Sequence, residues 1–194
     1  MNDYKKYDDT KLCALLGEKK SISNEAFNVL YSRYSAKLKS YCLFRTENRD
    51  EAEELHQETW LKFHSYAVKG NCKSIVLPAY LFVIARNLNI DKHRIANNKN
   101  LVSIESINYN GFADPLNLES EVENKEMLSI VMIALNQLSE KSKETFILRW
   151  FSGLKYSDIS EITNESVDCI KQRSSRAMDE IIKILKPIII EINK

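Results

Sequence analysis

Glycine, proline and cysteine are scarce in this chain, which has only 4 Gly, 3 Pro and 4 Cys among 194 residues. So few helix-breaking residues, together with 44% hydrophobic and 28% charged residues, exclude disorder throughout and favour a folded, helix-rich protein. The cysteines are far apart and form no CxxC pair: Cys13, Cys42, Cys72 and Cys169. This spacing argues against a zinc site or a disulfide framework, so we expect reduced, buried thiols.

Long apolar runs are also absent. No stretch reaches the roughly 20 apolar residues that a membrane-spanning helix needs, and the polar start MNDYKKYDD has no apolar signal core. We therefore expect no membrane insertion and a cytoplasmic protein. The length suits two small domains, because compact domains usually hold on the order of 100 to 150 residues.

Charge is nearly balanced over the whole chain but strongly segregated along it. The formal net charge is +1, yet residues 47–58 carry six acidic side chains against one basic one. Residues 86–99 carry four basic side chains against one acidic one. An acidic and a basic surface would allow one chain to hold a protein and a nucleic acid at once.

Apolar residues recur every three or four positions in the first half and predict four helices, over residues 10–17, 25–42, 50–67 and 78–96. Asp8 or Asp9 can cap the first helix, and Pro78 suits the first turn of the fourth. The third helix turns Glu53, Glu54, Gln57 and Glu58 away from its apolar stripe.

The fourth predicted helix has a basic face opposite its apolar arc. Arg86 and Arg94 could bind phosphates there, beside Asn87 and His93, which can hydrogen-bond bases. Tyr80 and Phe82 are nearby and could stack on bases. A solvated polar face above core aromatics explains the same pattern, and for Phe82 core packing is favoured.

Asn, Gly and Pro interrupt the helical pattern over residues 97–123, which we interpret as a linker that becomes acidic toward its end. Further helices are predicted over residues 125–138, 140–151, 157–162 and 167–185, with Ser139 and Ser166 as caps and Gly153 as a terminator. The last two form a helix-turn-helix around Thr163, Asn164 and Glu165, although an ordinary amphipathic hairpin fits the periodicity too. Pro187 should bend or end the last helix.

The segment DEAEELHQETWLKF could also be interpreted as a metal or acid-base site around His56. A helical metal site needs partner ligands from another helix, and the other histidines, His64 and His93, supply no EXXH or HEXXH pattern, so we expect no metal and no cofactor. Two interpretations of this segment remain: a solvated acidic face, or a docking surface for a basic partner.

Several of these segments resemble the extracytoplasmic-function group of sigma-70-type factors. AFNVLYSRYSAKLKSYC, DEAEELHQETWLKF and PAYLFVIARNLNIDKHR are similar to region 2 of that family. ALNQLSEKSKETFILRWFSGLKYSDISEI, which runs into CIKQRSSRA, resembles region 4. The resemblance implies an all-α protein with region 2 in residues 1–96, a flexible acidic linker in 97–124 and region 4 in 125–194.

The same resemblance implies a sigma factor that is not an enzyme, binds core RNA polymerase and directs promoter-specific transcription initiation on promoter DNA. The implied core-polymerase-binding residues are Asp50, Glu53, Glu54, Leu55, Gln57, Glu58 and Trp60. Those implied to contact the minus-10 element are Arg86, Asn87, Asp91, Lys92 and Arg94. Those implied to contact the minus-35 element are Lys171, Arg173, Ser175 and Arg176.

The chain departs from the family pattern in the helix-turn-helix. Thr163, Asn164 and Glu165 replace the usual apolar residue, glycine and apolar residue, and Lys155 replaces a Ser or Thr cap. Asn tolerates a left-handed backbone, but a carboxylate at position 165 must be exposed or paired.

Two rival functions remain at this stage. A stand-alone helix-turn-helix regulator would bind duplex DNA without polymerase, and a helical metal-dependent hydrolase would use the residues near His56. Many members of the group are held by an anti-sigma factor, a further candidate partner that no residue here identifies.

Overall fold

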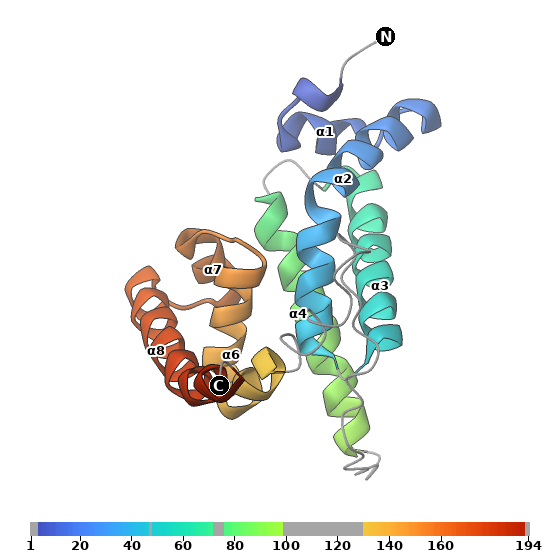
Figure 1. The fold of residues 1–194 in the computed structure, drawn as a ribbon. Coiled ribbons are helices and arrows are strands. Elements are labelled where there is room, and N and C mark those ends of the chain that lie inside the picture. The colour runs from blue at the N-terminus through green and yellow to red at the C-terminus, as the bar shows by residue number, and fades with distance from the viewer. Residues whose placement is uncertain (1–3, 47, 72–75, 99–129, 193–194) are drawn as a thin grey trace. The chain divides into compact units, whose positions relative to one another are not determined.

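The computed structural model describes residues 4–46, 48–71, 76–98 and 130–192, and every regular element within these ranges is a helix (Figure 1). The predicted all-α class is confirmed. The chain divides into two compact units: Met1–Thr46 with Asp50–Ile104, and Glu105–Lys194 with Glu47–Arg49. Most of the predicted linker, with residues 125–129 and Cys72, lies outside the described residues, so the domain limits at 96 and 124 stay predictions.

The first unit is built on three long helices, which lie side by side in Figure 1. They are α2 (Lys20–Arg45), α3 (Arg49–Val68) and α4 (Leu77–Asn98), preceded by a short 3₁₀ turn, η1 (Tyr4–Lys6), and by α1 (Asp9–Leu15). The Asp8 side chain accepts the Lys11 backbone N–H at 2.8 Å, which confirms the predicted cap of α1. The helices meet through fully buried apolar side chains, among them Leu30, Tyr41, Leu55, Phe63 and Phe82.

Helix α2 begins five residues before the predicted start. Ser23 and Ala26 in this first stretch are buried, and the Ser23 hydroxyl donates to the Leu16 carbonyl at 2.9 Å. The extra turn therefore gains a tertiary contact with the end of α1. Sequence periodicity could not reveal it, because KSISNE has no apolar repeat.

The second unit begins with a helical stretch over residues 130–137. It continues with α6 (Glu140–Phe146), a π-helical turn η4 (Ile147–Phe151), α7 (Tyr156–Thr163) and α8 (Val167–Ile192). Ser139 caps α6 as predicted, and its hydroxyl accepts the Ser142 N–H at 3.3 Å. The predicted single helix over residues 140–151 is thus α-helical only as far as Phe146. It widens in its last turn, where the Ser152 N–H reaches the Ile147 carbonyl at 3.0 Å.

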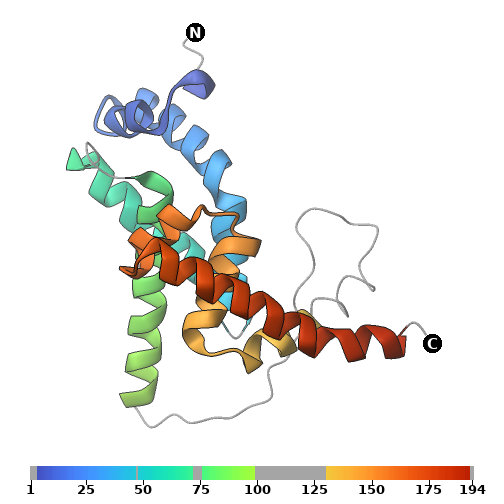
Figure 2. The same cartoon turned by 90° about the vertical axis from the view of Figure 1, so that its left-hand side faces the viewer.

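Helix α8 does not end at Pro187, as Figure 2 shows. Of the two outcomes expected at Pro187, a bend or an end of the helix, the end is therefore wrong, and α8 continues to Ile192. Proline deprives the carbonyl four residues earlier, that of Lys183, of its helical partner. Because Lys183 is exposed, water can replace that partner. Ile182 and Ile190 are also half exposed, so these two side chains do not pack into the core of the unit.

Two further expectations concern membranes and thiols. Within the described residues, no helix is long and apolar enough to span a bilayer. Cys13 and Cys42 are free and buried, as expected. Cys169 is exposed, which corrects the prediction of burial, because its position on α8 faces away from the core residue Ile170.

Candidate functional site

The acidic residues of α3 form the first candidate surface. Asp50, Glu54 and Gln57 are exposed, while Glu53 and Glu58 are partly buried. The other two predicted docking residues lie inside the unit, with Leu55 fully buried and Trp60 only 4% exposed. The predicted set therefore divides into five polar side chains at the surface and two apolar ones that pack beneath it.

Each glutamate on this surface pairs with a lysine. Glu53 meets Lys39 at 2.8 Å, and that hydrogen bond is the main reason that its pKa is lowered. Glu58 meets Lys62 at 3.5 Å along the same helix. Exposed pairs of this kind contribute about 0 to 1 kcal/mol each, so a more basic partner can displace the lysines.

An aromatic cluster supports the surface from below. Trp60 donates its indole N–H to Nε2 of the buried His56 at 3.2 Å, and the Ser35 hydroxyl lies 3.0 Å from the same nitrogen. Nε2 is therefore an acceptor and the ring is neutral. Phe27 and Tyr31 of α2 pack on the indole with centroid distances of 5.5 and 5.0 Å. Among the described residues, no group of three or more His, Cys, Asp or Glu side chains could hold a metal ion.

A pocket of about 460 Å³ opens above this cluster between α2 and α3. The residues that line it are mainly aromatic or amide-bearing: Asn24, Phe27, Tyr31, His56, Gln57, Trp60, Leu61 and His64. Leu61 is 70% exposed, so it presents an apolar side chain beside Gln57. The sequence analysis missed this pocket, although an apolar residue on an otherwise polar face was a signal that could have indicated it.

His56 should make the first unit less stable in mild acid. Burial lowers its pKa, so the unfolded chain binds more protons on this residue once the pH falls below the ordinary value of about 6.5. Stability should then decline as the pH falls. We expect His56→Gln, which keeps an acceptor for Trp60, to flatten this decline between about pH 7 and pH 5 in urea unfolding. If the unfolding free energy of the variant falls with pH as steeply as that of the wild type, His56 is not the group responsible.

The basic face of α4 is the second candidate surface. Asn87, Asp91, His93 and Arg94 are exposed, while Arg86 and Lys92 are partly buried. Beside them, Ile90 and Ile95 are 43% and 53% exposed. The predicted minus-10 residues thus lie on the exposed part of one helix, next to apolar side chains that could contact bases.

Ion pairs occupy two cations of this face. Lys92 reaches Glu54 of α3 at 2.6 Å, and Arg94 lies 3.3 Å from Asp91 one turn earlier. The Lys92–Glu54 pair joins the two candidate surfaces, which sequence reasoning did not anticipate. Phe82 is fully buried and packs edge-on against Tyr41 at 5.4 Å, so it is a core residue, as favoured.

The third candidate surface is the helix-turn-helix of α7 and α8. Asn164 has a left-handed backbone (φ 57°, ψ 40°), as expected from its replacement of glycine. Asp158 accepts the Lys155 backbone N–H at 3.1 Å and so helps to cap α7 without a Ser or Thr. Ser166 caps α8 as predicted, by accepting the Cys169 N–H at 3.3 Å. The turn therefore forms despite its unusual residues.

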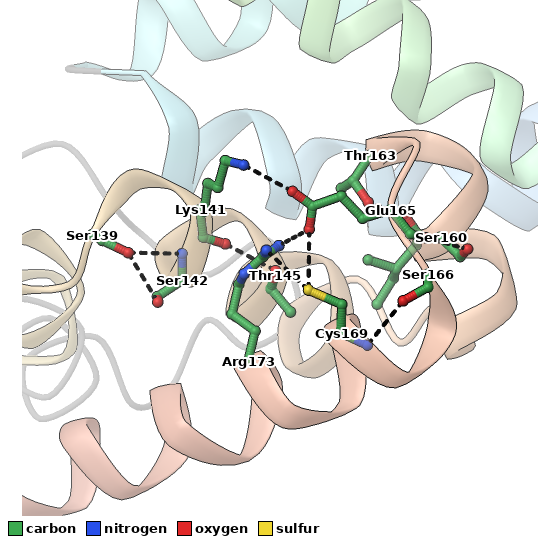
Figure 3. A network of polar contacts seen from close by, with 11 residues as sticks. Ser139, Lys141, Ser142, Thr145, Ser160, Thr163, Glu165, Ser166, Cys169 and Arg173 are labelled. Atoms are coloured by element: carbon green, nitrogen blue, oxygen red, sulfur yellow. Dashed lines mark hydrogen bonds and ion pairs between the residues drawn. The ribbon is translucent and has the colours of Figure 1, made fainter.

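Glu165 is paired rather than exposed, which resolves the difficulty that its sequence position posed (Figure 3). Its carboxylate lies 2.9 Å from the Lys141 ammonium of α6 and forms an ion pair with the Arg173 guanidinium of α8. These two cations, Arg173 first, hold the pKa of Glu165 below its ordinary value. The carboxylate thus connects the turn to α6 and to α8.

The predicted minus-35 residues fall into two kinds. Lys171, Ser175 and Arg176 are exposed on α8, opposite the buried Ile170 and Ala177. Arg173 differs, because its side chain is only 17% exposed and its guanidinium is engaged by Glu165 and by the Cys169 sulfur at 3.5 Å.

Comparison with known proteins gives two family matches. The description "Sigma-70 region 2" matches residues 30–98, and "Sigma-70, region 4" matches residues 129–181. The chain is 27% identical over 171 residues to the ECF RNA polymerase sigma-E factor of Haemophilus influenzae, covering 84% of this chain and 89% of that protein. It is 25% identical to the ferric citrate uptake sigma factor FecI of Escherichia coli, over 79% of this chain and 87% of that protein.

A solved structure is also similar. The sigma factor RpoE in complex with the anti-sigma factor NepR from Bartonella quintana matches with a TM-score of 0.66 and 26% identity. The match covers 84% of this chain and 98% of that one. The same helical architecture therefore occurs along almost the whole of that chain.

Proposed function

This chain belongs to the extracytoplasmic-function group of the sigma-70 family. We propose a separate binding role for each of its three candidate surfaces. The protein binds core RNA polymerase and directs promoter-specific transcription initiation. The acidic surface of α3 binds the polymerase, α4 contacts the minus-10 element, and α8 contacts the minus-35 element. The observation that carries this assignment is the exposed set Lys171, Ser175 and Arg176 on the second helix of a well-formed helix-turn-helix.

The polymerase-binding surface consists of Asp50, Glu53, Glu54, Gln57 and Glu58, together with the neighbouring pocket. Exposed carboxylates would attract a basic helical surface and orient it, while the exposed Leu61 and the aromatic pocket provide apolar contact beside them. Leu55 and Trp60 act indirectly, because they hold α3 against the core.

The α4 surface suits DNA that is being opened. Arg86, Lys92 and Arg94 supply positive charge for phosphates, and Asn87 and Asp91 supply hydrogen-bonding groups for bases. Binding of an unpaired base offsets an unstacking cost of a few kcal/mol. Promoter opening on this scheme uses binding energy and needs no catalytic residue, so we place the protein among non-enzymatic subunits.

An anti-sigma protein is a further proposed partner. The similar RpoE chain is held by an anti-sigma factor in its solved structure. A protein that covered the α3 surface would block polymerase binding directly. Such a partner would need basic groups to match the five acidic or amide side chains there.

The decisive experiment is gel filtration of the purified chain with core RNA polymerase from the same organism, followed by run-off transcription from a promoter library. We expect co-elution and specific transcripts. Glu54→Ala combined with Glu58→Ala should weaken polymerase binding by on the order of tenfold, because two partly exposed charge contacts are lost.

The matched control removes two exposed acidic residues from the second unit, Glu161→Ala with Glu180→Ala, and changes the net charge equally. It should bind polymerase as the wild type does. Equal affinity of the α3 double variant and the wild type would refute the docking surface. Duplex DNA binding without any polymerase binding would favour a stand-alone helix-turn-helix regulator instead.

A further inference from the structure

We propose that Glu165 converts Arg173 from a phosphate contact into a positioning residue, and so makes promoter recognition by α8 more selective. The inference rests on the proposed function of α8 and concerns how that helix divides its work. It identifies a carboxylate in the turn as a determinant of specificity, and it assigns recognition to Lys171, Ser175 and Arg176.

The geometry places one carboxylate between two cations from different helices (Figure 3). One oxygen of Glu165 accepts from Lys141 of α6 at 2.9 Å, and the other pairs with Arg173 of α8. The Cys169 thiol lies 3.9 Å from that second oxygen and 3.5 Å from an Arg173 nitrogen. The guanidinium therefore has partners on both of its terminal nitrogens.

The backbone around Glu165 is held independently of these charges. The Ser160 hydroxyl donates to the Glu165 carbonyl at 2.5 Å, and the Glu165 N–H reaches the Ser160 carbonyl at 3.3 Å. Lys141 is anchored in the first turn of α6, where the Thr145 hydroxyl donates to its carbonyl at 2.8 Å. The backbones of Glu165 and Lys141 are thus held by hydrogen bonds that do not involve Arg173.

Exposure shows why Arg173 is withheld from a phosphate. The side chains of Arg173 and Glu165 are 17% and 21% exposed, whereas Lys171 is 57% exposed. If the guanidinium moved to a phosphate, the partly buried Glu165 carboxylate would keep only Lys141 as a cation partner. The desolvation cost of this carboxylate would then be less well compensated. Lys171 meets no such obstacle, since its pair with Asp168 is loose, at 3.8 Å.

Selectivity follows from the balance between phosphate and base contacts. Each phosphate neutralised by a side chain contributes about 0.9 to the slope of log K against log salt, and it strengthens binding to all sequences alike. With Arg173 withheld, α8 offers fewer sequence-independent contacts. Hydrogen bonds to base edges then form a larger share of its binding energy.

The test measures duplex binding by the full chain at several salt concentrations, using fluorescence anisotropy. The probes are a duplex carrying a promoter recovered by run-off transcription and a scrambled duplex of equal length and composition. Arg173→Gln alone should leave the salt slope unchanged. Glu165→Gln should steepen it by about 0.9 and raise affinity for the scrambled duplex roughly eightfold near 0.1 M salt.

The double variant Glu165→Gln with Arg173→Gln should restore the shallower slope, because the released cation is gone. If Arg173→Gln alone lowers the slope by about 0.9, Arg173 already binds a phosphate and the proposal is overturned. The proposal is also overturned if Glu165→Gln steepens the salt slope equally with and without Arg173. Loss of the carboxylate charge alone would then explain the steeper slope.

A second measurement does not depend on DNA. A double-mutant cycle of Glu165→Gln and Arg173→Gln in urea unfolding should show coupling of roughly fivefold in the unfolding equilibrium constant. Absence of coupling would overturn the proposal. A chain that binds duplex DNA but not polymerase would refute the sigma-factor assignment, while the slopes and the cycle would still decide the role of Arg173.

Discussion

Lys171→Ala combined with Arg176→Ala should reduce affinity for a minus-35 duplex by on the order of a hundredfold. Both side chains are exposed on α8, so their truncation leaves no cavity and should barely change stability. Each contact to a base edge is worth about 1 to 3 kcal/mol, and each contact to a phosphate about 0.9 in the salt slope. Titrations of promoter and scrambled duplexes would separate the two kinds of contact.

The control for this double variant lies on the same helix. Lys183 and Lys186 are also exposed, and replacing both with alanine removes the same charge farther from the turn. This variant should keep the specific affinity within a few fold of the wild type. A loss as large as that of the Lys171 and Arg176 variant would mean that α8 acts only through its overall charge.

Trp60→Ala should destabilise the first unit by about 3 to 5 kcal/mol, a large part of the stability of a small domain. The indole is 4% exposed, packs against Phe27, Tyr31 and Phe63, and donates to His56. Its removal leaves a cavity and takes from His56 Nε2 one of its two hydrogen-bond partners, so that only the Ser35 hydroxyl remains. Urea unfolding of the wild type and the variant, monitored by circular dichroism, would measure this loss of stability.

Trp60→Phe separates packing from direct contact with the polymerase. Phenylalanine keeps most of the apolar volume and loses the hydrogen bond to His56, so we expect a smaller loss of stability and nearly normal polymerase binding. If the variant is stable but no longer binds polymerase, the indole itself must contact the partner. That result would return Trp60 to the docking surface.

Helix starts that carry a capping side chain were predicted well, whereas the uncapped start of α2 and the end of α8 were not. Asp8, Ser139 and Ser166 cap their helices as expected, because a capping side chain acts within three residues of itself. Helix α8 passes through Pro187, because Lys183, whose carbonyl loses its helical partner, is an exposed residue and water can replace that partner. Such outcomes depend on surroundings that a single sequence does not describe.

The candidate surfaces were predictable to the extent that helical periodicity separates polar from apolar positions. It placed Glu54, Gln57 and Arg94 outside and Leu55 in the core stripe, as the structure has them. It could not reveal the pairing of Glu54 with Lys92, because ion pairs between helices depend on how each helix is rotated against the next.

On the proposed assignment of the two surfaces, the Lys92–Glu54 pair links polymerase binding and DNA binding thermodynamically on the first unit. When the polymerase engages Glu54, Lys92 is released for DNA, and DNA that engages Lys92 frees Glu54 in return. The two effects must be equal in free energy, because linkage is reciprocal. Exposed pairs of this kind hold about 0 to 1 kcal/mol, so the cooperativity from this pair is at most about fivefold.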